Sequence, residues 1–199
     1  MSDGHKHPEE QTDEELIAAF QQGSVRAFNV IVARYKNPLT NFVYRFVGDL
    51  DECDDIVQET FIRVFRNKHA YTPRAKFSTW IYTIASNLAK SRLRQRDRHR
   101  VFSLSSLWSS EEGGREMEIP DNRYAADRDA ESHLKLDRIQ KALNTISPKY
   151  REVVVLRDVQ ELSYDEIARV TGLNLGTVKS RIKRGRMMLQ TLLKDIIHD

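Results

Sequence analysis

Several features that mark secreted, metal-binding or membrane proteins are scarce in this 199-residue sequence. Its single cysteine, Cys53, cannot form an internal disulfide, and with only scattered histidines the chain has no ligand set for structural zinc. Because no run of about 18 apolar residues occurs, we expect no segment to span a membrane. The polar start, residues 1–11, lacks the apolar core of a secretory signal. We interpret it as a disordered tail of a cytoplasmic protein.

The charge of the chain is nearly balanced overall but unevenly distributed. The net charge is only +3, yet residues 61–100 contain eleven Lys and Arg against one acid, Asp97. Residues 108–131 reverse this balance, and the C-terminal part is basic again. A nucleic acid responds to the local charge rather than to the total, so the two basic segments are candidate binding surfaces.

Hydrophobic periodicity of the helical kind dominates, and neither alternating strands nor internal repeats are evident. We predict an all-α fold with a helical domain at 12–102, a flexible acidic linker at 103–129 and a second helical domain at 130–199. In the first domain the apolar pattern predicts helices at about 13–22, 24–36, 39–47, 50–65 and from 77 into the arginine-rich segment. The second of these is expected to break at Asn37-Pro38.

The second domain contains the pattern of a helix-turn-helix. Ser147-Pro148 is typical of a helix start, and Ser163 with Glu166 forms a capping box for the first helix of the motif. Gly172 suits a left-handed helix end, and Asn174 can cap the next helix. The turn between them is short enough to require a close helix pair.

The second helix of this motif has one apolar side and one basic side. Its apolar stripe consists of Leu175, Val178, Ile182, Gly185 and Leu189. The opposite side carries Thr177, Ser180, Lys183 and Arg184, flanked by Lys179, Arg181 and Arg186. Such a face can reach base edges and phosphates in a major groove. The alternative is an ordinary amphipathic helix with a solvated basic face.

The helix that starts at Phe77 carries a different set of polar residues. Thr83, Asn87, Lys90 and Arg94 share one side, with Trp80 at its edge. An amide, cations and an aromatic ring suit unstacked, single-stranded nucleic acid. Core packing for Trp80 and a solvated surface position for Asn87 are the alternatives.

An acidic cluster surrounds the start of the helix at 50–65. It contains Asp51, Glu52, Asp54, Asp55 and Glu59, together with Gln58. Interaction with the helix dipole explains some of these acids, and a protein-docking surface explains them all. No His or Lys accompanies them at ligand spacing, which argues against a metal site or acid–base catalysis.

Three segments in register resemble a known family. DDIVQETF at 54–61, KFSTWIYTIASNLAK at 76–90, and LSYDEIA at 162–168 with GTVKSR at 176–181 are similar to the extracytoplasmic function (ECF) group of bacterial RNA polymerase sigma factors. The resemblance extends from about Thr12 to Leu193. It implies that the first domain is sigma region 2 and the last domain sigma region 4, with neither enzymatic activity nor a cofactor.

The resemblance also implies roles for individual residues. Docking on the clamp helices of the largest polymerase subunit would use Asp54, Asp55, Gln58 and Glu59, and the flap of the second largest subunit would be a further contact. Capture of the melted −10 element would use Tyr71, Arg74, Lys76, Trp80, Thr83, Asn87, Lys90 and Arg94. Reading of the −35 duplex would use Thr177, Lys179, Ser180, Arg181, Lys183 and Arg184.

Within this scheme Asn87 and the loop at 71–76 would hold a flipped base. Some relatives carry an aromatic residue at the position of Lys183, so the base preference there can differ. The acidic linker would either lie in polymerase channels or act only as a solubilising tether. The resemblance also implies an anti-sigma factor as a further partner.

Two other functions compete with this interpretation. A two-helix transcriptional regulator would share PKYREVVVL at 148–156 and the second helix of the motif, but would leave 76–90 unexplained. A nuclease or recombinase would need clustered carboxylates or a nucleophile, and the sequence shows neither.

Overall fold

A computed structural model describes residues 10–107 and 127–194 of the chain. These residues form helices and turns without any strand, which confirms the predicted all-α class for the described ranges. The first half contains α1 (Asp13–Gln21), α2 (Val25–Val47), α3 (Leu50–Arg66), the 3₁₀ turn η2 (Lys68–Ala70) and α4 (Phe77–Leu107). The second half contains α5 (Asp127–Thr145), α6 (Pro148–Val154), the π turn η3 (Val155–Val159), α7 (Tyr164–Thr171) and α8 (Leu175–Leu192).

Local capping signals set most of the helix ends. Thr12 and Glu15 form the capping box predicted for α1. Ser163 and Glu166 do the same for α7, and the Asn174 side chain accepts the amide of Thr177 at the start of α8. Gly172 ends α7 with a left-handed φ of 71°. These predictions are confirmed. Ser147 precedes α6 as predicted, but its side chain makes no capping hydrogen bond.

The predicted break at Asn37-Pro38 is wrong, because α2 runs through both residues as one helix. The buried side chains of Ile31, Tyr35 and Leu39 continue a single stripe across the proline. Pro38 itself lies on the exposed side. Water can therefore reach the carbonyl that the proline ring deprives of an amide donor, and core packing holds the helix in register.

Helix α4 continues to Leu107 and α5 begins at Asp127, so both ends of the predicted linker at 103–129 are helical. Residues 108–126, which carry most of its acidic residues, lie outside the described part of the chain, as do residues 1–9 of the predicted tail. Within the described ranges, no helix has the length and apolar character needed to cross a membrane.

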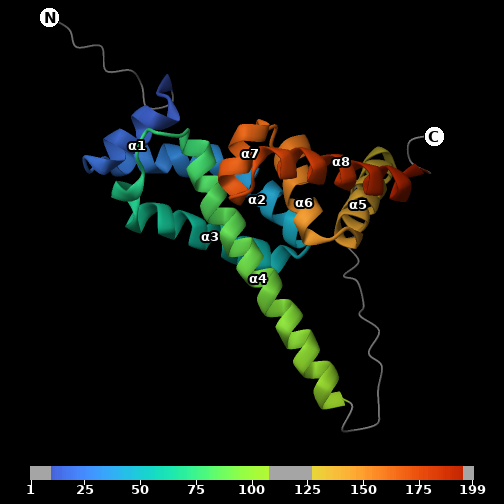
Figure 1. The fold of residues 1–199 in the computed structure, drawn as a ribbon. Helices are drawn as coiled ribbons and strands as arrows, with labels where there is room; N and C mark the ends of the chain where they lie inside the picture. Colours follow the sequence, from blue (N-terminus) through green and yellow to red (C-terminus); the bar gives the residue numbers. More distant parts are fainter. Residues whose placement is uncertain (1–9, 108–126, 195–199) are drawn as a thin grey trace, which may run out of the picture.

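The two halves of the chain pack against each other around one continuous set of buried side chains. Helix α7 lies along the N-terminal part of α4, whereas α5 and α6 lie beside the C-terminal end of α2 (Figure 1). The C-terminal part of α4 extends away from this body (Figure 1). The fold therefore brings the second half of the chain onto the helices that carry the predicted single-strand face.

Candidate nucleic-acid interface

The inward side of α8 anchors the helix-turn-helix. Val178 and Ile182 are fully buried. A Cβ on Gly185 would lie 2.5 Å from Cγ2 of Val154, so glycine permits the close approach of α8 to α6. Leu189 is half-buried, but Leu175 departs from the predicted stripe and remains 37% exposed at the first turn. Burial of the central stripe fixes which side of α8 faces outward.

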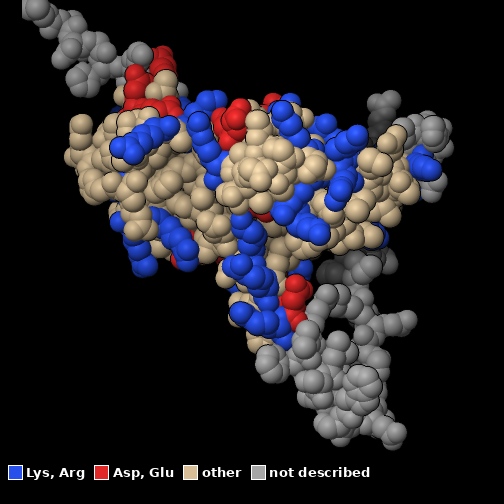
Figure 2. Space-filling view, in the orientation of Figure 1, with Lys and Arg blue, Asp and Glu red and all other residues tan. Residues whose placement is uncertain are grey.

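The outward side of α8 presents the side chains predicted to read DNA. Lys179, Ser180, Lys183 and Arg184 are exposed, and Thr177 is half-buried. Among the described residues, neither Lys179 nor Lys183 has an ion-pair partner. Lys and Arg side chains gather over α8 and along α4 on the face shown in Figure 2. This part of α8 is thus an open cationic surface.

Two arginines of α8 already contact protein groups. The Arg184 guanidinium lies close to the Tyr150 hydroxyl, and its positive charge helps to lower the pKa of that tyrosine. Arg186 was expected near DNA phosphates. In the structure it forms a bidentate hydrogen-bonded ion pair with Asp158, and its Nε lies 3.0 Å from one carboxylate oxygen. A bidentate pair of this kind has well-defined geometry. Arg186 therefore fixes α8 to η3.

The loop before α4 is built around aromatic packing. The ring of Tyr71 packs against Phe77 and Trp80, and its hydroxyl donates to the Ala75 carbonyl at 2.8 Å. Only 6% of Tyr71 is exposed, whereas Trp80 is half-buried and Arg74 is exposed. In this conformation Tyr71 shapes the loop and does not present its ring to a ligand.

The predicted single-strand side of α4, with Trp80, Thr83, Asn87, Lys90 and Arg94, is called the α4 face below. Its side chains differ in their accessibility. Asn87 is exposed, and the Thr83 hydroxyl donates to the Thr79 carbonyl of its own helix at 2.7 Å. Lys90 forms an ion pair with Glu152 at 3.2 Å, and Lys76 forms one with Glu166 at 2.9 Å. Both carboxylates belong to the second half of the chain. Two of the cations predicted to hold the −10 strand are therefore already neutralised.

Glu152 also accepts a hydrogen bond from Ser86 and is 5% exposed. Neither residue was predicted from the sequence to belong to a site. A signal was available, since Arg151-Glu152 places two charges directly before the apolar run Val153–Leu156. A buried charge needs a partner, but the sequence could not show that the partners lie on α4.

A cavity of about 320 Å³ lies between the halves. Lys90 and Arg94 line it from α4, and half-buried Arg181 lines it from α8. Apolar side chains, among them Phe46 and Leu93, form part of its wall. The fold thus brings residues predicted for −10 binding close to one predicted for −35 binding.

The acidic residues at and after the start of α3 divide into two parts, the cap residue Asp49 and members of the predicted cluster. Asp49 caps the helix by accepting the Glu52 amide at 3.1 Å, as acids near a helix start commonly do. Asp54, Asp55 and Gln58 are exposed further along, and half-buried Glu59 is hydrogen-bonded to Arg63 at 2.8 Å. This second part is an accessible acidic surface, which fits docking better than helix stabilisation.

One residue of the predicted acidic docking surface already contacts another helix of the protein. Asp55 lies 3.5 Å from Arg92 of α4, and a cavity of about 230 Å³ separates the two helices there. In the described residues no cluster of His, Cys, Asp or Glu could hold a metal ion.

Two family models match the chain in succession. Residues 31–99 match sigma-70 region 2, and residues 136–189 match sigma-70 region 4. The chain is 36% identical to the ECF RNA polymerase sigma factor SigW of Bacillus subtilis over 185 residues, which cover 90% of this chain and 96% of SigW. It is 34% identical to the ECF RNA polymerase sigma factor SigE of Mycolicibacterium smegmatis over 88% of this chain and 65% of that longer relative.

Two solved structures have the same arrangement of helices. CnrH in complex with the cytosolic domain of CnrY superimposes with a TM-score of 0.68 at 27% identity, covering 93% of this chain and 99% of that chain. The sigma factor RpoE of Bartonella quintana, in complex with the anti-sigma factor NepR, gives a TM-score of 0.64 at 26% identity over 84% of this chain and 96% of that chain.

Proposed function

This chain belongs to the ECF group of sigma-70 RNA polymerase sigma factors, and we propose that it divides promoter recognition between the α8 face and the α4 face. As a sigma factor it binds RNA polymerase core and directs transcription initiation at promoters. The division of labour assigns duplex reading to the helix-turn-helix and strand capture to the first half.

The observation that carries this proposal is the presence of two chemically different basic faces on one chain. The α8 face has exposed Lys and Arg opposite a buried stripe, which suits direct readout in a major groove. The α4 face carries exposed Asn87 about two helical turns along α4 from Trp80, whose ring packs with those of Tyr71 and Phe77, and an amide and an aromatic ring on one side of a helix suit an unstacked base. A helix-turn-helix regulator accounts for the first face but not for the second.

For the −35 element, Lys179, Ser180, Lys183 and Arg184 would contact bases and phosphates, with Thr177 and Arg181 at the margins. Exposed Lys and Arg can donate to the O6 and N7 acceptors of guanine, whereas Ser and Thr suit phosphates or base edges. Arg186 is assigned to positioning because Asp158 already holds it.

For the −10 element, Asn87 would hydrogen-bond a flipped base beside Trp80 and Thr83. Arg74, Lys76, Lys90 and Arg94 would hold the phosphates of the strand, and Tyr71 would support the loop from below. Unstacking a base costs a few kcal/mol, and phosphate contacts made by preplaced cations offset that cost.

The acidic surface of Asp54, Asp55, Gln58 and Glu59 would dock on the clamp helices of the largest polymerase subunit. The flap of the second largest subunit is proposed as a second contact, made by the second half. An anti-sigma factor is a further proposed partner, supported by the complex in which RpoE was solved with NepR. We infer that the chain acts in the cytoplasm, together with polymerase, and is not itself an enzyme.

Transcription in vitro with purified polymerase core tests the function directly. Core supplemented with the chain should produce transcripts from specific promoters that core alone does not produce. Binding of duplex DNA without any gain of promoter-specific transcripts would instead identify a helix-turn-helix regulator.

A further inference from the structure

We propose that the free chain is self-occluded, with its second half seated on the α4 face so that it competes with the −10 strand for the same side chains. The inference rests on the proposed −10 role of that face. It goes further by identifying an intramolecular occupant, namely α6, η3 and α7.

The first support is the chemistry of the contact. Glu152 of α6 pairs with Lys90 and accepts a hydrogen bond from Ser86, while Glu166 at the start of α7 pairs with Lys76. Carboxylate oxygens thus bind the cations that would otherwise bind phosphate oxygens. A carboxylate beside each ammonium offsets its positive charge and repels a phosphate, so strand binding at Lys76 and Lys90 is favoured when these two carboxylates move away.

The second support is the extent of the packing along α4. Tyr82, 4% exposed, donates from its hydroxyl to Gln160 in the segment after η3. The buried side chains of both halves belong to one cluster. The ion pairs therefore lie at the edge of an apolar contact, and the contact as a whole stabilises the closed arrangement.

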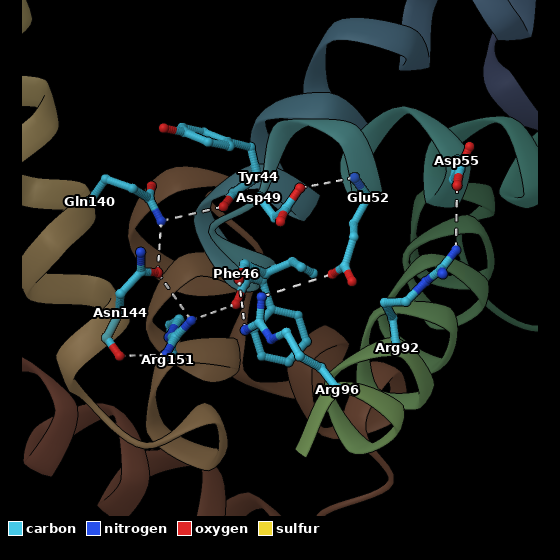
Figure 3. Close-up of polar contacts among 11 residues, drawn as sticks. Tyr44, Phe46, Asp49, Glu52, Asp55, Arg92, Arg96, Gln140, Asn144 and Arg151 are labelled. Atoms are coloured by element: carbon cyan, nitrogen blue, oxygen red, sulfur yellow. Dashed lines mark hydrogen bonds and ion pairs between the residues drawn. The ribbon is translucent and has the colours of Figure 1, made fainter. Parts of the chain in front are cut away.

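The third support is a set of hydrogen bonds that joins the second half to the C-terminal end of α2. We call it the α2 latch, and it consists of Gln140, Asn144 and Arg151. Gln140 Nε2 donates to the carbonyls of Tyr44 and Arg45 at 3.3 and 3.4 Å, and Arg151 donates to the Phe46 carbonyl at 2.9 Å (Figure 3).

The last carbonyls of a helix have no partner within the helix and need donors from elsewhere. In α2, residues of α5 and α6 supply those donors, joined by Arg96 of α4, which donates to the Val47 carbonyl at 3.3 Å. The end of a first-half helix is therefore completed by the second half. These directional hydrogen bonds favour one defined position of the second half relative to the first.

Gly48 lies directly against Asn144 of the α2 latch. It has a left-handed φ of 79°, and a Cβ placed there would lie 2.3 Å from Oδ1 of Asn144. That oxygen accepts hydrogen bonds from Gln140 and from Arg151 at 3.1 and 3.2 Å, so the Asn144 side chain cannot turn away without losing them. A methyl group at position 48 would therefore act as a wedge between the halves.

The experiment compares full-length Gly48→Ala with Gly23→Ala. Gly23 also has a positive φ, of 106°, but a Cβ there meets nothing within 4 Å, so this control carries backbone strain without the wedge. Gln140→Ala is a second variant that removes latch donors without adding strain. Circular dichroism first verifies that all three variants keep the helical content of the unmodified chain.

Two measurements are made on each protein. Small-angle X-ray scattering without DNA gives the radius of gyration, and fluorescence anisotropy gives the affinity for a labelled single-stranded DNA of degenerate sequence. We expect Gly48→Ala and Gln140→Ala to be more expanded and to bind the strand roughly five- to tenfold more tightly, because opening removes the competing carboxylates. Gly23→Ala should match the unmodified chain in both measurements.

Unchanged dimensions and affinity in both latch variants would overturn the proposal, and so would expansion without tighter strand binding. Failure of the function is a separate result, because it would appear as the absence of promoter-specific transcripts with the unmodified chain. The scattering comparison needs neither DNA nor polymerase, so the closed form is tested even then.

Discussion

The α8 face and the α4 face are both basic, but they differ in what lies opposite them. On α8, Lys179 and Lys183 are exposed, and in the described part of the chain neither has an ion-pair partner. At the α4 face, Lys90 and Lys76, which directly precedes the helix, are bound to carboxylates contributed by the second half. Within the described ranges one face has unpaired cations, whereas cations of the other face are paired within the protein itself.

The difference shows that a count of positive charges does not by itself predict a DNA-binding surface. A cation contributes to DNA affinity only if phosphate can displace its counterion, and a carboxylate held in place by a fold is harder to displace than a mobile ion. The order of events at a promoter follows from this. Under the proposed roles, duplex reading by α8 would need no rearrangement, whereas strand capture by α4 would require the second half to move.

The largest effect should come from removing the centre of the latch with Arg151→Ala. This guanidinium is 5% exposed and hydrogen-bonded to carbonyls of Phe46, Asn144 and Ile146. Burial and nearby Arg96 lower the pKa of Arg151 to about 10, so it stays charged at neutral pH. Arg151→Ala leaves those buried carbonyls without their donor, which should lower the free energy of unfolding by about 3 kcal/mol.

Urea denaturation measures this change, with Arg138→Ala as the matched control because Arg138 is an exposed residue of α5. Equal stability of the two variants would mean that the latch contributes little, and the two faces would then differ less than the structure indicates.

The next effect concerns the open face. Arg184→Ala should weaken binding to −35 duplexes by about 1–3 kcal/mol and relax the base preference at one position. Electrophoretic mobility shifts on a set of single-base variants of the site measure both. Equal weakening on every sequence would instead identify Arg184 as a phosphate contact without sequence preference.

The covered face is tested with Asn87→Ala. Loss of one base-specific hydrogen bond should weaken −10 capture by about 1–2 kcal/mol. Promoter melting can be followed with permanganate footprinting, while binding to core is followed by co-purification. Since Asn87 is exposed and lies on a different helix from the acidic surface, core binding should not change. Loss of core binding would show that Asn87 has a structural role.

The smallest effect concerns the charge of Glu166. Partial burial raises the pKa of this carboxyl, but hydrogen bonds from Ser163 and the contact with Lys76 outweigh burial and lower the pKa to about 2. A carboxyl with a lowered folded-state pKa stabilises the protein above its unfolded pKa of 4.5, and this contribution disappears as the pH falls toward 2.

Glu166→Gln keeps the capping geometry but not the charge, so we expect it to cost about 1 kcal/mol at pH 7. The difference from the unmodified chain should shrink steadily below pH 4.5. Thermal denaturation at pH 7 and at successively lower pH measures it, and a difference that grows as the pH falls would contradict the assignment.

Much of the local structure could be predicted from the sequence because its causes are local. A capping box joins residues three apart, as Ser163 and Glu166 do, and a left-handed helix end needs the freedom of glycine, as at Gly172. The spacing of Val178 and Ile182 likewise determines which side of α8 is buried and, by exclusion, which side faces outward.

Other features were decided by packing between distant segments. The sequence pattern predicted a break at Pro38, but the core on both sides of it held α2 together. Tyr71 was predicted to belong to the loop that would hold a flipped base, and its packing against Phe77 and Trp80 could not be read from the sequence. At Pro38 the apolar stripe outweighed a local preference, and at Tyr71 an aromatic cluster decided where the ring lies.

The sequence by itself determined the helices, their caps, the two basic segments and the family. Only the tertiary structure decided that Lys90 pairs with Glu152, that Lys76 pairs with Glu166, and that Gln140 and Arg151 complete the end of α2. The physical reason is the range of the interactions. Caps and periodicity act within a helical turn or two, whereas an ion pair between residues 62 or 90 positions apart exists only once the two halves have packed together.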